Sequence, residues 1–125
     1  MRLGVLTEPV GENRVAIVPN SVKKLMKKVL EVFLEKGAGK KSNYSDSDYS
    51  AAGANICSRE EALSCEIIMS IRMLDSSELR DGMNLVCVAD PFRHPEKIKS
   101  CIDSNVTLFS MDMIPRRLSR AQSMD

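Results

Sequence analysis

Short apolar runs recur along the chain, and the polar segments between them show helical spacing. This pattern most restricts the possible fold. The runs lie at Leu3–Leu6, Val32–Leu34, Ile67–Ile71, Leu85–Ala89 and Val106–Phe109. Nearly continuous apolar runs suit strands that are buried on both faces, as in parallel sheets. Their alternation with helices predicts an α/β fold: an open, three-layer, mostly parallel sheet of the Rossmann or flavodoxin-like type, with helices on both faces.

The segments between these runs carry signals for five helices. In chain order, helices are expected from Asn20 or Ser21 through Leu30, at Ser45–Ala52, from Ser58 through Leu63, weakly at Ser76–Arg80 and from Pro95 onward. Asn20 or Ser21 can cap the first helix. Ser58 and Glu61 have the spacing of a capping box. In the last helix, Ile98 and Ile102 are predicted to share one buried face.

Length, charge and cysteine pattern narrow the class of protein. A chain of 125 residues suits one domain with a single core. Its 18 Lys+Arg and 17 Asp+Glu residues nearly balance, so the basic field typical of nucleic-acid binding is missing. No apolar run approaches the roughly 20 residues of a membrane-spanning helix. The cysteines lack metal-binding spacing, so we expect no metal site and reduced thiols at Cys57, Cys65, Cys87 and Cys101.

Three sites in the body of the chain have both a functional and a structural interpretation. Arg14 follows the first strand, where open parallel sheets bind ligands, so it could meet an anion. It could instead pair with Glu8 or Glu12 and hold the loop together, and this structural role is favoured. Gly37-Ala38-Gly39 is interpreted as a turn, because it lacks the rest of a dinucleotide-binding fingerprint. His94 is interpreted as an exposed loop residue, since no nucleophile or carboxylate relay accompanies it.

The last eleven residues bring arginines, an amide and a carboxylate together. They read Pro115-Arg116-Arg117-Leu118-Ser119-Arg120-Ala121-Gln122-Ser123-Met124-Asp125. Arginine binds carboxylates or phosphates, glutamine can pair with a carboxamide, and aspartate accepts hydrogen bonds from ribose hydroxyls. The group could grip one end of a dinucleotide. It could also be a capped surface helix beginning at Ser119, and the residues alone favour neither. Because such a helix would stop after about two turns, we expect Asp125 to be a cut inside a longer polypeptide.

Taken together, the motifs resemble the alanine dehydrogenase/transhydrogenase family, and within it the N-terminal part of the alpha subunit of the proton-translocating NAD(P) transhydrogenase. The matching stretches are Arg2–Leu6, Gly11–Pro19, Val22–Leu25, Glu35–Gly39, Tyr49–Ala54 and Ser119–Asp125. The Gly-Glu-Asn-Arg-Val-Ala block that begins at Gly11 is shared with alanine dehydrogenases. Arg-Ala-Gln-Ser-Met-Asp, which ends at Asp125, is the more specific transhydrogenase signature.

The resemblance assigns roles to the C-terminal group. It implies that Arg117, Arg120, Gln122 and Asp125 bind NAD(H), and that Gln122 and Asp125 lie at the hydride-transfer site. Arg117 would order the loop and meet the carboxamide or phosphate side. Gln122 would contact the nicotinamide region, and Asp125 would hold a ribose hydroxyl. No metal is implied.

The resemblance also implies partners and a cellular setting. Residues 1–125 would be the N-terminal domain, ending at the start of a helix, and the glycine-rich NAD-binding domain would be absent. NADP(H) would be held by a partner component, and membrane subunits would couple hydride transfer to proton translocation. The alpha subunit would form a homodimer on the cytoplasmic side of the membrane. This chain alone is expected to be inactive. The alternatives are an alanine dehydrogenase-like oxidoreductase and a non-enzymatic module that retains the fold.

Overall fold

A computed structural model describes residues 1–28, 30–87 and 95–110. Six parallel strands form one sheet in the order β3-β2-β1-β4-β5-β6. The strands are β1 (Arg2–Val5), β2 (Glu31–Glu35), β3 (Asn55–Cys57), β4 (Ile67–Met69), β5 (Asn84–Cys87) and β6 (Thr107–Ser110). The order matches the Rossmann type of doubly wound sheet rather than the flavodoxin type. The predicted parallel α/β fold is confirmed.

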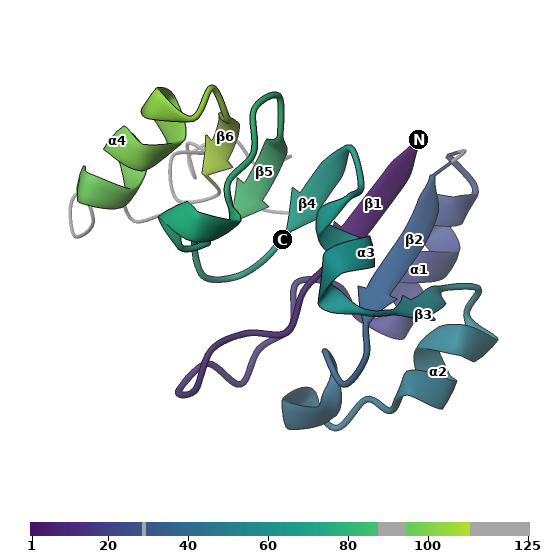
Figure 1. The fold of residues 1–125 in the computed structure, drawn as a ribbon. Helices are drawn as coiled ribbons and strands as arrows, with labels where there is room; N and C mark the ends of the chain where they lie inside the picture. Colours follow the sequence, from purple (N-terminus) through teal and green to yellow (C-terminus); the bar gives the residue numbers. More distant parts are fainter. Residues whose placement is uncertain (29, 88–94, 111–125) are drawn as a thin grey trace, which may run out of the picture.

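Helices connect these strands (Figure 1). They are α1 (Pro19–Met26), the 3₁₀ turn η1 (Lys40–Ser42), α2 (Asp46–Ala51), α3 (Arg59–Leu63), the 3₁₀ turn η2 (Ser76–Glu78) and α4 (Pro95–Asp103). Figure 1 shows α1 behind β2 and α3 in front of β1. None of the described helices is long and apolar enough to cross a membrane.

Apolar side chains form one core on each face of the sheet. Val22 of α1 and Tyr49 of α2 pack in one core with Leu3 and Val5 of β1. The core on the other face contains residues of α3, β4, β5 and α4, with Ala62 at its α3 side. Successive residues of a strand point to opposite faces, which is why short apolar runs can serve both cores. The expected three-layer arrangement, with helices on both faces, is therefore confirmed.

Two helix starts agree with the sequence analysis in detail. Ser45 caps α2: its hydroxyl accepts from the N–H of Asp48, whose carboxylate accepts from the N–H of Ser45. At α3 the Ser58 hydroxyl accepts from the N–H of Glu61, which confirms the helix start at Ser58 and one half of the predicted capping box. Each cap satisfies a backbone N–H that has no partner inside its helix.

The predicted bounds of the first helix are wrong at both ends. The helix begins at Pro19, and the preceding Val18 provides no side-chain cap. Proline suits this position because its fixed φ is helical and its missing N–H is not needed. The helix ends at Met26 instead of Leu30. Because β2 starts at Glu31 in register with β1, the chain needs the intervening residues for the return turn.

Three further elements differ from the prediction. The edge strand β3 was not expected, because its three residues, Asn55-Ile56-Cys57, are too short an apolar signal. The weak helix expected at Ser76–Arg80 is the 3₁₀ turn η2. In α4, Ile102 is 71% exposed, whereas Cys101 is buried and Ile98 packs against the same core. The buried face of α4 thus contains Ile98 and Cys101, which are three residues apart, rather than Ile98 and Ile102.

None of the four cysteines forms a disulfide, which agrees with the reduced thiols that the sequence analysis expected. Three are buried, and Cys57 is partly buried. Burial raises the pKa of the Cys57 thiol to about 11, mainly by desolvation, so the thiol stays protonated at neutral pH. The cysteines act in this fold as small apolar side chains.

Candidate functional site

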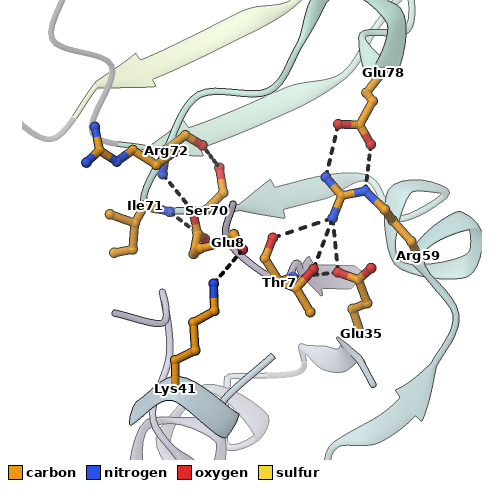
Figure 2. Close-up of polar contacts among 9 residues, drawn as sticks. All are labelled: Thr7, Glu8, Glu35, Lys41, Arg59, Ser70, Ile71, Arg72 and Glu78. Carbon is orange, nitrogen blue, oxygen red and sulfur yellow. Dashed lines mark hydrogen bonds and ion pairs between the residues drawn. The ribbon is translucent and has the colours of Figure 1, made fainter. Parts of the chain in front are cut away.

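Polar side chains gather at the carboxyl ends of β1, β2 and β4 (Figure 2). The chain runs outward from β1 to β3 and then returns to place β4 beside β1. Strand order therefore reverses between β1 and β4, and open α/β sheets bind ligands in the crevice outside such a reversal. We call this region the switch point. It is formed by the loop after β1 (residues 6–18) and the loop after β4 (residues 70–75).

Glu8 joins the two loops at the switch point. Its carboxylate accepts hydrogen bonds from the backbone N–H groups of Ile71 and Arg72, both at 2.9 Å. Figure 2 shows the carboxylate reaching from the β1 side to the turn after β4, where the Ser70 hydroxyl also donates to the Arg72 carbonyl. Hydrogen bonds from backbone N–H groups to a carboxylate are among the stronger ones in proteins. Glu8 therefore fixes the spacing of the two loops.

Glu12 forms a second link between the same loops. Its carboxylate accepts from Nε of Arg14 at 2.8 Å, from Nη2 of Arg14 at 3.0 Å and from Nε of Arg72 at 3.0 Å. The backbone N–H of Arg14 donates to it as well. The Glu12 side chain is only 5% exposed, whereas those of Arg14 and Arg72 are 66% and 54% exposed. One buried carboxylate thus holds two arginines from neighbouring loops.

A tight turn delivers Glu12 to this position. The N–H of Glu12 donates to the carbonyl of Pro9 at 3.1 Å, which closes a four-residue turn. Gly11, its third residue, has a φ of +97°. Residues with a side chain rarely adopt this conformation, so the turn depends on glycine at that position. Val10 at its tip is fully exposed.

Arg59 is the centre of a third group of contacts, shown on the right of Figure 2. Its guanidinium binds both carboxylate oxygens of Glu78, at 2.6 and 3.0 Å, and Glu35 at 3.0 Å. It also donates to Thr7 at 3.4 Å, and the Thr7 N–H donates to Glu35. Thr7 follows β1, Glu35 is the last residue of β2, and Glu78 belongs to η2. Arg59 therefore links both sides of the switch point.

The segment from η1 to α2 supports the loop after β1. Three of its side chains donate to carbonyls of that loop. Lys41 binds the carbonyls of Glu8 and Pro9, and the Ser42 hydroxyl binds that of Asn13. The buried Tyr49 hydroxyl donates to the carbonyl of Ile17 at 2.7 Å. The loop is consequently held along most of its length.

The carboxylates of the switch point have opposite pKa shifts. The hydrogen bonds from Arg14 lower the pKa of Glu12 from 4.5 to about 2. Burial raises the pKa of Glu8, although the N–H groups of Arg72 and Ile71 act in the other direction. The hydrogen bond from Arg59 lowers the pKa of Glu78. The two arginines therefore face a firmly ionised Glu12 at neutral pH.

The described residues include only one of the predicted site residues. Arg14 pairs with Glu12, which is one of the two partners expected for its structural role, and its possible contact with an anion is not tested. Arg117, Arg120, Gln122 and Asp125 lie outside the described residues, as does His94, and their predicted roles are not tested. Gly37–Gly39 forms a turn as expected: Gly37 has a φ of +82°, and a Cβ at Gly39 would collide with the Tyr49 ring.

The sequence analysis missed Glu35, Arg59, Arg72 and Glu78 as parts of this region. The sequence indicated a position at the carboxyl edge of the sheet only for Glu35 and Arg72, because each of them directly follows an apolar run. Arg59 and Glu78 reach this edge through packing of α3 and η2. In the described part of the chain, no cluster of His, Cys, Asp or Glu is arranged to hold a metal ion.

Comparisons with known proteins show the same fold and related sequences. Residues 4–125 match the family described as alanine dehydrogenase/PNT, N-terminal domain. NAD(P) transhydrogenase subunit alpha of Cereibacter sphaeroides is 37% identical over 120 residues, which are 92% of this chain and 23% of that protein. A crystal structure of transhydrogenase from Sinorhizobium meliloti superposes with a TM-score of 0.93 and 32% identity. That match covers all of this chain and 39% of the other.

A structure of L-alanine dehydrogenase is also similar, with a TM-score of 0.84 and 25% identity over 89% of this chain and 32% of the other. The chain thus spans between about a quarter and two fifths of the length of these relatives. Its parallel six-stranded sheet and the match over nearly all of its residues lead to the same assignment. The chain belongs to the alanine dehydrogenase/PNT N-terminal domain family.

Proposed function

We propose that this chain is the first domain of an NAD(P) transhydrogenase alpha subunit, which takes part in hydride transfer between NAD(H) and NADP(H). The observation that carries the proposal is the match to a transhydrogenase structure over the whole chain, with a TM-score of 0.93. The 37% identity to a transhydrogenase alpha subunit supports it at the level of sequence. The more distant similarity to L-alanine dehydrogenase makes amino-acid oxidation the second candidate.

The described residues do not form a cradle for a dinucleotide. The one Gly-x-Gly segment, Gly37–Gly39, is a turn in which Gly39 is buried against Tyr49. A pyrophosphate needs backbone N–H groups at a glycine-rich helix start, and the turn leads only to the short 3₁₀ turn η1. The proposal therefore places the adenosine and pyrophosphate of NAD(H) on a separate glycine-rich domain outside residues 1–125.

This chain would contribute contacts to the nicotinamide end of NAD(H). In the proposal, Arg117, Arg120, Gln122 and Asp125 contact NAD(H), with Gln122 and Asp125 at the point of hydride transfer. Direct transfer between two nicotinamides needs orientation and a suitable polarity rather than a nucleophile or a general base.

The proposal includes the assembly in which this domain would work. NADP(H) would be bound by a separate component, and membrane subunits would couple the transfer to proton translocation. The alpha subunits would form a homodimer, attached to the membrane through those partners on its cytoplasmic side. The isolated chain of 125 residues would transfer no hydride, because it would lack the domain that binds most of NAD(H).

A chimeric subunit tests this function. Residues 1–125 would replace the matching segment of the Cereibacter sphaeroides alpha subunit, and hydride transfer from NADPH to an NAD analogue would be measured with the other components present. We expect transfer by the chimera, and a fall of at least tenfold with Gln122→Ala. A folded chimera that transfers no hydride would contradict the proposal. Amination of pyruvate by the same chimera would instead favour the alanine dehydrogenase alternative.

A further inference from the structure

A turn between η2 and β5 carries the one Asp-Gly pair of the sequence. The N–H of Met83 donates to the carbonyl of Arg80 at 3.1 Å, which closes a four-residue turn with Asp81 and Gly82 at its centre. Gly82 has a φ of +81°, as the third residue of a type II turn requires. Asp81 and Gly82 are both exposed, and a Cβ at Gly82 would meet no other atom within 4 Å. Water therefore reaches both residues of the pair.

An exposed Asp-Gly pair can rearrange without an enzyme. The amide nitrogen of the glycine attacks the side-chain carboxyl carbon of the aspartate. A nitrogen–carbon bond forms, and the amide proton and the carboxyl hydroxyl leave together as water. Glycine favours this attack because it has no side chain to obstruct it. Water then opens the five-membered imide. Opening at the former backbone carbonyl leaves the chain running through the side chain, as isoaspartate, with no net change of mass.

Asn105 holds both of the groups that would react. Its carbonyl accepts from the N–H of Gly82 at 3.1 Å, and its side-chain amide donates to the carboxylate of Asp81 at 2.9 Å. The attack needs a nitrogen that has lost its proton and a carboxyl group that is turned toward it, so both contacts must break first. The two contacts therefore oppose the rearrangement in the folded chain.

Asn105 occupies a position at which glycine is the more usual residue. It follows α4 with a φ of +58°, and its N–H donates to the carbonyl of Ile102. The next N–H, that of Val106, donates to the carbonyl of Cys101, so the two contacts form a Schellman motif that ends the helix. Glycine adopts this left-handed conformation at the lowest steric cost. The helix end thus does not require the asparagine amide, and the contact of this amide with Asp81 is a separate role.

We propose that Asp81-Gly82 is a site of spontaneous isoaspartate formation and that Asn105 restrains this reaction in the folded chain. Isoaspartate adds an atom to the backbone of the turn, so the N–H of Gly82 no longer meets Asn105 in the present geometry. The turn leads into β5, and the N–H of Thr107 in β6 donates to the carbonyl of Met83. The modification therefore loosens the amino ends of β5 and β6. The inference concerns this end of the sheet alone and is independent of the proposed hydride transfer.

The experiment ages the 125-residue chain at neutral pH and measures isoaspartate in the peptide that contains Asp81, by liquid chromatography and mass spectrometry. Asn105→Gly removes the side-chain amide but keeps the left-handed residue and its carbonyl. We expect isoaspartate to form about fivefold faster in this variant, the factor that corresponds to the loss of one hydrogen bond. Asn105→Asp, which keeps the side-chain shape without the amide donor, should also react faster than the original chain. Asp81→Glu should give no measurable product at this position, because a six-membered ring forms much more slowly.

Urea and a distant variant complete the test. In urea the original chain and Asn105→Gly should react at one common rate that exceeds the rate of the folded chain. Tyr49→Phe weakens the fold at α2, away from this turn, and should react as slowly as the original chain. Equal rates for the folded original chain and Asn105→Gly would overturn the restraint, and so would an equal acceleration in Tyr49→Phe. Absence of isoaspartate at Asp81 even in urea would overturn the site itself.

Discussion

At the scale of single residues, Glu8 and Glu12 lie four positions apart in one loop, and the pKa values of their carboxyl groups are shifted in opposite directions. Glu12 accepts from two guanidiniums, and Glu8 accepts only from backbone N–H groups while partly buried. The pKa of Glu12 is therefore lowered and that of Glu8 is raised. The residue types alone do not distinguish the two, because both are glutamates in a polar loop.

The lowered pKa of Glu12 makes stability depend on pH. Its folded pKa of about 2 lies below its ordinary value of 4.5, so its contribution is present above pH 4.5 and is lost as the pH falls toward 2. Glu8 acts in the opposite direction, because its raised pKa favours the folded state when protonated. We expect Glu12→Gln to lose less stability than the original chain between pH 4.5 and 2. Urea unfolding at a series of pH values measures this, and equal slopes would contradict it.

The sequence predicted part of this site at the residue scale. Pairing of Arg14 with Glu8 or Glu12 was favoured over contact with an anion, and in the structure the partner is Glu12. The partner Arg72 is 60 residues away from Glu12, and only the pairing of β1 with β4 brings it near. A pattern in one sequence cannot show which loops meet until the strand order is known.

At the scale of elements, the short segment from η1 to α2 acts as the support of the loop after β1. The Tyr49 hydroxyl is its one fully buried donor, and desolvation raises the pKa of Tyr49 to about 12. The sequence predicted a helix at Ser45–Ala52, but it gave no sign of this support. The donors and their carbonyl partners are about 30 residues apart and depend on packing rather than on local pattern.

Removal of this hydroxyl should weaken the support without creating a large cavity. We expect Tyr49→Phe to reduce the free energy of unfolding by about 1 kcal/mol, because the buried carbonyl of Ile17 loses its hydrogen bond. Tyr44→Phe is the matched control, since Tyr44 contacts the Tyr49 ring edge-on from a less buried position. Denaturant unfolding measures both. A loss for Tyr44→Phe as large as that for Tyr49→Phe would contradict the role of this hydrogen bond.

At the scale of the whole molecule, the three-layer arrangement could be predicted from the sequence, because a strand formed by an apolar run must be covered on both of its faces. The predicted class and five of the six strands are correct. The sixth, β3, has only three residues and joins the sheet at an edge. Strand order was not predictable from the runs, and it is this order that creates the switch point. The overall fold was thus easier to predict from the sequence than the arrangement of residues at the switch point.

Arg59 connects the two halves of the sheet and should matter more than a surface ion pair. Its partners Glu35 and Glu78 lie on opposite sides of the strand reversal. We expect Arg59→Ala to lower the free energy of unfolding by about 2 kcal/mol, because two partly buried carboxylates lose a charged donor. Arg2→Ala, which breaks the exposed pair with Glu66, should cost clearly less, because water screens such a pair. Equal costs in chemical unfolding would contradict this ranking.

The links across the switch point have a consequence for the order of folding. Glu8 and Glu12 bind residues that are 60 to 64 positions further along the chain. When a chain is synthesised from its N-terminus, these carboxylates emerge well before their partners exist. Contacts of such large sequence separation also carry the greatest cost of loop closure. The loop after β1 is therefore made before the residues that it binds, and its links across the switch point form only once β4 has joined the sheet.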